Sequence, residues 1–512
     1  MGNYFFSYVC FAIIKKRTAM PTATSSPSRN RLISFPGSLP ALACGILMAC
    51  ACGGPTGNSN DLASSTGLPE GFESKIDQVV ADYRDLEIFS GVVLVAREGT
   101  PFYEKAFGLA DRDRNIPNSP TTLFDIGSMN KTFTSVVVKQ LAEEGKLNLS
   151  DKLVDYIPGW EDPRASDITL LHLLEHRSGF GDYHSRGYFD LPLEERKLGP
   201  IVERAKSTQL LFDPGTGDEY SNLGYVILGG VIEKATGRSY FEEVRERIVG
   251  PLGMENTYLT NPHRVADRAA KGYLYTPLGV LEENEAVQDL PNPDGGFLST
   301  ARDILTFYHS YYYDTLLLSA KTRETDPFFQ YIRELPEGRA TGAAGGFEGF
   351  NSVFLQVISD DLSILVLANM DEPVAERIGS DILALYRGEE PAKPVLPAVQ
   401  LVRQNYLEHG VDYVKNHFDS LTVNFHPTDP KDLILNQLGY AFLYGADDPE
   451  RAAELFRLNT ELFPEVANCW DSYGEALRAA GNTEDAMAAY QKALELRPGL
   501  ESAETALNEM KR

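Results

Sequence analysis

The sequence predicts an α+β fold in which an antiparallel β-sheet is flanked by helices and a helical lobe, followed by an all-α repeat module. Three observations support this prediction. Hairpin patterns lie near residues 90–108 and 352–369, helical patterns fill the sequence between them, and a helical repeat follows a proline-rich stretch at 390–397. Strands at both ends of a helical segment predict one sheet that is assembled from both ends of the domain.

The two hairpins are visible as paired β-rich runs around short turns. Residues 90–108 read SGVVLVAREGTPFYEKAFG, with a Gly/Pro turn between the runs. Residues 352–369 read SVFLQVI and SILVLAN around the turn SDDL. Apolar residues at helical spacing predict helices over 128–144, 220–236 and 301–313.

The C-terminal part contains an internal repeat. LGYAFLYGADDPERAAELFRLNTELFP aligns with YGEALRAAGNTEDAMAAYQKALELRP, so that Phe456 matches Tyr490 and Gly439 matches Gly474. The period and the closing prolines resemble tetratricopeptide repeats. We expect residues 396–420 to form a third, irregular helix pair, or else the array to pack on the preceding domain. The module is either a structural appendage or a groove for a peptide or protein partner.

Length and charge limit the possible functions. A chain of 512 residues can form two to four domains, and its net charge of −26 argues against a nucleic-acid partner. Four of the five cysteines lie before residue 53, which leaves only Cys469 in the folded body. The sequence therefore contains neither a disulfide framework nor a Cys/His pattern for zinc.

Residues 1–52 are predicted to be a targeting segment. Arg31 precedes an apolar run that ends in small residues and cysteines, which is the order of a bacterial secretory signal. Leu47-Met48-Ala49-Cys50 resembles the lipobox of bacterial lipoproteins, so we expect lipidation at Cys50, with Cys52 as the alternative acceptor. The alternatives for this segment are a signal peptide without lipidation or an uncleaved hydrophobic anchor. Translation could start at Met1 or at Met20.

A Gly/Ser/Asn-rich tether over 53–70 would then hold the protein at the cell envelope, on the periplasmic side of a membrane.

Ser128 and Lys131 are the first candidate catalytic residues. They lie three apart at the start of an apolar helical pattern, so their side chains share one face. A lysine on a buried face should have a lowered pKa, and such a lysine beside a hydroxyl is suited to activate a serine nucleophile. The alternative is that Ser128 only caps the helix.

A second motif favours catalysis. In LFDPGTGDEYSNLGYVILGG (211–230), a Pro/Gly turn precedes Tyr220-Ser221-Asn222 and another apolar helix. Together with the S-x-x-K motif at Ser128, this stretch resembles the β-lactamase-related serine hydrolases: class C β-lactamases, D-alanyl-D-alanine carboxypeptidases and esterases. The segments at 168–180, 251–257 and 295–307 also look like that family, and the resemblance covers residues 72 to 388. It implies a β-lactamase/penicillin-binding-protein-like fold.

The resemblance implies roles for these residues. Ser128 would be the nucleophile, Lys131 would assist its deprotonation, and Tyr220 would pass the proton to the leaving group. Asn222 would hold a substrate carbonyl or the lysine, although Tyr220 and Asn222 could instead form a turn and a cap. We expect His172 and His176 to be structural rather than catalytic, and Tyr311, Tyr312 and Tyr313 to serve packing.

A third motif departs from the family pattern. The family has Lys or His, then Thr or Ser, then Gly on the strand that lines the cleft. Here TGAAGGFEGFNSVFLQ (341–356) places Ala343-Ala344-Gly345 at that position, and a second register uses Ala340-Thr341-Gly342 after Arg339. Backbone N–H groups of Ser128 and Gly346 can still form an oxyanion hole. The basic side chain for a substrate carboxylate is missing, so we expect an ester or uncharged amide substrate rather than a β-lactam.

These observations divide the chain into a targeting segment (1–52), a tether (53–70), a serine hydrolase domain (71–390) and a helical module (396–512). We expect acylation of Ser128 and hydrolysis by water, with neither a metal nor an organic cofactor. Gly345 and Gly346 would contribute to substrate binding beside Asn222. The rival hypothesis is an inactive penicillin-binding-like scaffold that binds a peptide or envelope partner through its repeat module.

Overall fold

The computed structural model describes residues 67–511 apart from 185–187, 260–264, 266, 285–289, 372 and 424–429. The predicted targeting segment, its lipidation site Cys50 and most of the tether lie outside the described residues, and they stay predictions. No helix in the described part of the chain is long and apolar enough to cross a membrane.

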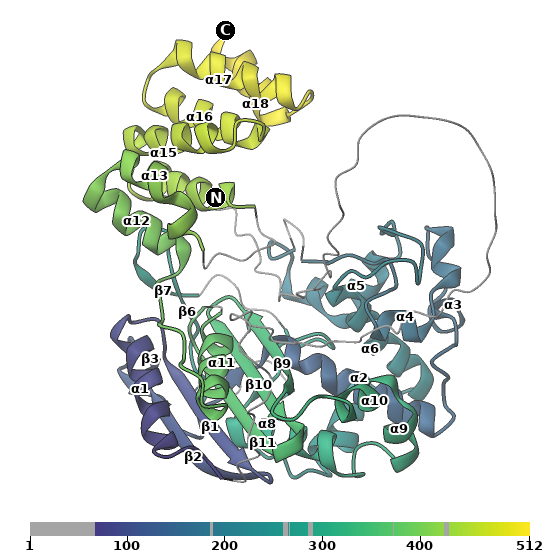
Figure 1. The fold of residues 1–512 in the computed structure, drawn as a ribbon. Helices are drawn as coiled ribbons and strands as arrows, with labels where there is room; N and C mark the ends of the chain where they lie inside the picture. The colour runs from purple at the N-terminus through teal and green to yellow at the C-terminus, as the bar shows by residue number, and fades with distance from the viewer. Residues whose placement is uncertain are drawn as a thin grey trace, which may run out of the picture.

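One antiparallel sheet of five strands organises the first domain (Figure 1). Its order is β2-β1-β11-β10-β9, so strands from both ends of the domain pair at the centre, as the sequence predicts. The strands are β1 (Gly91–Arg97), β2 (Thr100–Phe107), β9 (Ala340–Phe347), β10 (Phe350–Val357) and β11 (Leu362–Ala368). Both predicted hairpins are confirmed.

The apolar runs of β1 and β11 reflect burial on both faces of the sheet. A strand that is covered on one side only would alternate polar and apolar residues, but all seven residues of β11 are buried. Helices α1 (Phe72–Asp85) and α11 (Val374–Tyr386) cover one face, where they pack on Val93 and Val366. The opposite face packs on α2 (Asn130–Glu143) and α8 (Ala301–Tyr313).

A helical lobe lies beside the sheet (Figure 1). Its centre is α6 (Asn222–Thr236), which packs against α2, and both helices are predicted from the sequence. The lobe and its surroundings also contain α3 (Leu153–Tyr156), α4 (Leu170–Leu174), α5 (Leu198–Ala205), α7 (Tyr240–Val244), α9 (Ala320–Thr325), α10 (Pro327–Arg333), η2 (Pro163–Asp167), η3 (Leu193–Arg196) and η4 (Arg245–Val249).

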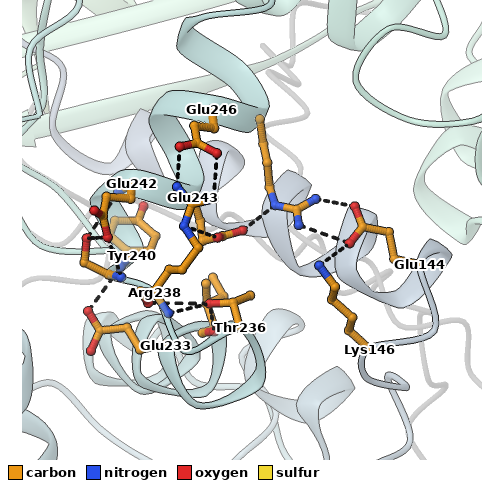
Figure 2. A network of polar contacts seen from close by, with 12 residues as sticks. Glu144, Lys146, Glu233, Thr236, Arg238, Tyr240, Glu242, Glu243 and Glu246 are labelled. Atoms are coloured by element: carbon orange, nitrogen blue, oxygen red, sulfur yellow. Dashed lines mark hydrogen bonds and ion pairs between the residues drawn. The ribbon is translucent and has the colours of Figure 1, made fainter.

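An ionic network joins the end of α2 to α7 and η4. Arg247 donates to Glu243 at 2.5 Å and to Glu144 at 2.6 and 3.1 Å, and Lys146 lies 2.8 Å from Glu144. Figure 2 shows this network continuing from Glu243 to Arg238 and Glu246. Two segments a hundred residues apart in the sequence are thus held together by paired charges on the rim of the lobe.

Three short two-stranded sheets complete the domain. They pair β3 (Leu109–Asp111) with β4 (Ile116–Pro117), β5 (Phe124–Asp125) with β8 (Leu298–Ser299), and β6 (Tyr273–Tyr275) with β7 (Leu281–Glu283). The β5–β8 pair holds the turn that carries Ser128.

A helical module follows residue 397. It contains α12 (Ala398–His409), α13 (Val411–Leu421), α14 (Asp432–Tyr440), η7 (Ala441–Gly445), α15 (Pro449–Leu462), α16 (Ala467–Ala479), α17 (Thr483–Leu496) and α18 (Glu501–Met510). Helices α12 and α13 form the expected third pair.

The two aligned repeats make the same internal contact. Gly439 faces the ring of Phe456, and Gly474 faces the ring of Tyr490, so that each glycine admits an aromatic side chain of the next helix. Their assignment to the tetratricopeptide type stays a prediction.

Candidate active site

Ser128 lies in a short 3₁₀ turn, η1 (Gly127–Met129), between β5 and α2. Its side chain caps neither η1 nor α2, whose N-cap positions are Ile126 and Met129, so the capping alternative is wrong. Ser128 is half-buried, whereas its neighbours Gly127 and Met129 are buried. The turn therefore leaves Ser128 partly accessible while its two neighbours are packed in the interior.

Lys131 lies behind the serine and is buried. Its ammonium nitrogen donates to Ser128 Oγ at 3.0 Å and to the backbone carbonyl of Asp294 at 2.8 Å. Both acceptors are uncharged oxygens, which compensate only in part for the loss of water. Burial lowers the pKa of Lys131 to about 8, although the carboxylates of Asp294 and Asp182 oppose the shift. At pH 7 roughly a tenth of Lys131 is therefore a free amine, far more than for an ordinary lysine.

Tyr220 reaches the same serine from a segment 92 residues further along the chain. Its hydroxyl donates to Ser128 Oγ at 2.7 Å. The ring of Tyr220 also lies 5.0 Å from Lys131 Nζ, within the range of a cation–π contact. The structure thus brings together the three residues that the sequence predicts to be catalytic.

His176 packs against Tyr220 and the backbone that follows it. Its ring stacks on the Tyr220 ring at 4.7 Å, and its Nδ1 accepts the Ser221 backbone N–H at 3.0 Å. Burial, reinforced by the charge of Lys131, lowers the pKa of His176 to about 3. The imidazole is therefore neutral and acts as a packing surface, in line with the expectation that it is no catalytic base.

Asn222 begins helix α6 and makes a contact that the sequence does not reveal. Its Nδ2 donates to both carboxylate oxygens of Asp182 at 3.2 Å, and its distance to His184 Nδ1 is 3.4 Å. Burial opposes ionisation of Asp182, but hydrogen bonds from His184 and Asn222 outweigh it and hold the Asp182 pKa below its usual value. Within the described residues, Asn222 is not a hydrogen-bond partner of Lys131.

Asp294 is a further residue that sequence reasoning missed. It is 4% exposed, its backbone oxygen accepts from Lys131, and its Oδ2 accepts from the Tyr183 hydroxyl at 3.0 Å. Burial raises the pKa of the Asp294 carboxyl, with Lys131 opposing the shift. The available signal was a charged residue between Pro293 and Gly295 in the segment just before 295–307.

Strand β9 closes the site opposite the serine turn. A Cβ on Gly345 would lie 2.0 Å from the Ile126 carbonyl oxygen and 2.7 Å from Ser128 N. This close approach requires glycine and selects the register Ala343-Ala344-Gly345 over Ala340-Thr341-Gly342. Ala343 is buried in the core cluster that contains Met129 and Phe133, so β9 brings no charged side chain to the motif position.

The hairpin geometry orients the backbone of Gly346. Phe347 pairs with Phe350 around the two-residue turn Glu348–Gly349, and Gly346 pairs with Asn351. Hydrogen-bonded and non-hydrogen-bonded pairs alternate in an antiparallel ladder, so the Gly346 N–H points away from β10. A Cβ on Gly127 would lie 2.6 Å from that nitrogen. The backbone nitrogens of Ser128 and Gly346 therefore belong to two segments in direct contact.

The arrangement combines a hydroxyl, an amine of lowered pKa, a phenol and two adjacent backbone segments that can supply N–H donors. These are the parts that acyl transfer to a serine requires. The described residues contain no group of three or more His, Cys, Asp or Glu side chains placed to hold a metal ion.

Comparison with known proteins agrees with this geometry. The family model described as Beta-lactamase matches residues 74–387. Penicillin-binding protein 4* of Bacillus subtilis is 31% identical over 316 residues, which cover 56% of this chain and 69% of that protein.

Two solved structures show the same fold. FmtA from Staphylococcus aureus has a TM-score of 0.52 at 25% identity and covers 64% of this chain and 93% of its own. The octameric penicillin-binding protein homologue from Pyrococcus abyssi has a TM-score of 0.54 at 24% identity, over 64% of this chain and 80% of its own. The chain belongs to the β-lactamase family of serine hydrolases.

Proposed function

We propose that this protein hydrolyses an ester or an uncharged amide through an acyl-enzyme on Ser128. The observation that carries the proposal is the pair of hydrogen bonds at Ser128 Oγ, from Lys131 at 3.0 Å and from Tyr220 at 2.7 Å. A serine that only caps a helix has no need of either partner.

In the first step, the free amine of Lys131 accepts the Ser128 proton while Oγ forms a bond to the substrate carbonyl carbon. Negative charge develops on the carbonyl oxygen, where the N–H groups of Ser128 and Gly346 stabilise it. The Tyr220 hydroxyl then donates its proton to the departing alcohol or amine and regains one from Lys131. Water attacks the resulting acyl-enzyme in the second half of the reaction and regenerates Ser128.

The charges around the site favour a substrate without a carboxylate. Ala343 supplies no cation from β9, and the carboxylates of Asp182 and Asp294 both act on Lys131. A substrate carboxylate would gain no ion pair from the motif and would meet this negative field. Losing a charge-assisted hydrogen bond costs about 1.5–3 kcal/mol, which corresponds to roughly 10- to 150-fold in binding.

A serine-reactive phosphonate tests the nucleophile. We expect one adduct, located on Ser128 by peptide mass spectrometry, and no adduct in Ser128→Ala. Labelling elsewhere, or equal labelling of Ser128→Ala, would refute the proposal. An inactive binding scaffold would show no turnover of nitrophenyl esters, nitrocefin or D-alanyl peptides. We expect turnover of the esters above that of the other two substrates.

A further inference from the structure

The β6–β7 hairpin is a part of the hydrolase domain that contacts both the C-terminal module and the sheet. In Figure 1 it lies between α12 and the strands of the sheet. Residues 276–280 form its tip, where the Thr276 N–H donates to the Val280 carbonyl and the Gly279 N–H donates to the Thr276 carbonyl. The proposed hydrolase mechanism assigns no role to this hairpin.

The module holds the tip of the hairpin. Gln400 Nε2 on α12 donates to the Thr276 carbonyl at 2.7 Å. Leu278 packs against the apolar core of the module, next to Gly445. The guanidinium of Arg403 covers Gly279 so closely that a Cβ there would overlap it. One side of the tip is therefore packed against the module, while Val280 stays exposed.

The base of the hairpin holds the turn between β9 and β10. Asn284, the residue after β7, donates from Nδ2 to the Glu348 carbonyl at 2.9 Å. Gly272, just before β6, lies against Gly349 and the ring of Phe350. The hairpin is also anchored on the sheet, since the Tyr273 N–H donates to the Asn369 carbonyl at 3.2 Å.

The β9–β10 turn positions strand β9, which carries the Gly346 N–H proposed to stabilise the oxyanion. Glu348 and Gly349 close the β9–β10 hairpin only two residues after Gly346, whose nitrogen contacts the Ser128 turn. Strand β9 is the edge of the sheet, so β10 holds it from one side only. A contact that fixes the turn therefore limits how far the Gly346 N–H can move relative to Ser128.

We propose that the C-terminal module sets the rate of catalysis through the β6–β7 hairpin, with Asn284 as the positioning residue that fixes the β9–β10 turn. The inference rests on the proposed role of Ser128 and Gly346 and goes beyond it, because it gives the module a function in turnover. The coupling runs through contiguous contacts from Gln400 and Leu278, along the hairpin, to Asn284 and Glu348.

Steady-state kinetics of the full-length chain on a nitrophenyl ester test the first contact. Asn284→Ala and Asn284→Asp both remove the N–H donor to Glu348, and Asn284→Asp keeps the shape of the side chain. We expect kcat to fall about tenfold in both, with KM unchanged within twofold, because a displaced oxyanion donor acts on the transition state. An unchanged kcat, or a rise in KM alone, would overturn the proposal.

The second contact is tested at the tip. Leu278→Asp places a charge against the apolar core of the module, whereas Val280→Asp, at a residue that is 53% exposed, is the matched control on the same loop. We expect Leu278→Asp to lower kcat about tenfold and Val280→Asp to leave it unchanged. The milder Gln400→Ala should lower kcat in the same direction if Leu278→Asp does not fold.

The double variant Asn284→Ala/Leu278→Asp separates coupling from general destabilisation. If both changes release the same turn, the double variant should lose no more than about tenfold in kcat; independent effects would multiply to about a hundredfold and overturn the proposal. Phosphonate labelling of wild-type Ser128 is measured alongside. If wild-type Ser128 is labelled and every variant keeps wild-type kinetics, only the coupling is refuted. If wild-type Ser128 is not labelled, the proposed function is refuted as well.

Discussion

Two cations on helices of this domain, Lys131 and Arg247, have opposite surroundings. Arg247 contacts two carboxylates, Glu243 and Glu144, on the rim of the lobe (Figure 2). Lys131 is more deeply buried and, among the described residues, donates only to a hydroxyl and a backbone carbonyl. Removing one partner of a buried ion pair destabilises a fold, whereas a desolvated amine without direct charge compensation is easily deprotonated. The first network suits stability and the second suits chemistry.

The largest expected effect comes from removing the buried amine. Lys131→Met should lower kcat/KM by about 10³-fold or more, because Ser128 loses its proton acceptor. Thermal unfolding should not shift to lower temperature, since a desolvated amine is replaced by an apolar chain of similar length.

The matched control for this change is Lys139→Met on the same helix. Lys139 is also partly buried, but it pairs with Asp326 at 2.6 Å. The control should lose stability and keep its activity. Equal losses of activity in both variants would show that the surroundings of Lys131 are not special.

Arg247→Met should have the reverse outcome. Removing the arginine leaves the Glu243 carboxylate, whose side chain is 4% exposed, with Arg238 at 3.4 Å as an ionic partner, so the loss should stay below the roughly 3 kcal/mol of an uncompensated buried charge. Urea unfolding should show this loss, while kcat/KM of the folded enzyme stays within twofold. The control is Arg245→Met, because Arg245 is exposed on the same η4 turn. It should change neither the urea unfolding nor kcat/KM. A stable Arg247→Met would mean that the network contributes little.

The pH dependence of activity should follow Lys131. Because its pKa is lowered to about 8 and its free amine is the reactive form, kcat/KM should rise about tenfold per pH unit below 8 and level off above it. Measurement on a neutral nitrophenyl ester from pH 6 to 9.5 checks this, after subtraction of spontaneous hydrolysis. A bell-shaped pH dependence of kcat/KM with its maximum near pH 5 would indicate a carboxylate base instead.

The smallest effect is expected at Glu144. Hydrogen bonds from Arg247 and Lys146 lower its pKa to about 2, so its contribution to stability is present above its usual pKa of 4.5 and lost as pH falls toward 2. Glu144 is 41% exposed, so Glu144→Gln should cost at most about 1 kcal/mol at pH 7. Urea unfolding at pH 7 and pH 3 should show the difference shrinking in acid, and a constant difference would contradict it.

Much of the site follows from local spacing. Ser128 and Lys131 lie three apart, so one turn of helix places both side chains on the same face whatever surrounds them. The third motif is also local: Gly345 and Gly346 are identifiable from the glycine pattern, although the sequence leaves two registers open. The contact of Gly345 with the Ser128 turn decides between them, because only a glycine fits there.

Other parts of the site depend on contacts between distant segments. Asn222 was expected to hold a substrate carbonyl or the lysine, but its amide donates to Asp182, forty residues earlier. Asp294 and His176 were not recognised as neighbours of Lys131 and Tyr220. The charged residue between Pro293 and Gly295 marks Asp294 in the sequence, but neither residue can be assigned to the site locally, because each becomes a neighbour only when distant segments pack together.

The sequence by itself determines the two hairpins at 90–108 and 352–369, the three helices predicted between them, the placement of Lys131 beside Ser128, and the absence of a basic residue at Ala343. Each of these depends on residue type and on spacing within one element. Only the tertiary structure decides that Tyr220 reaches Ser128, that Lys131 has no carboxylate in direct contact within the described part of the chain, and that the helical module holds the β6–β7 hairpin. These features depend on which distant segments pack together, and packing follows from the shape and burial of the whole domain rather than from any short stretch.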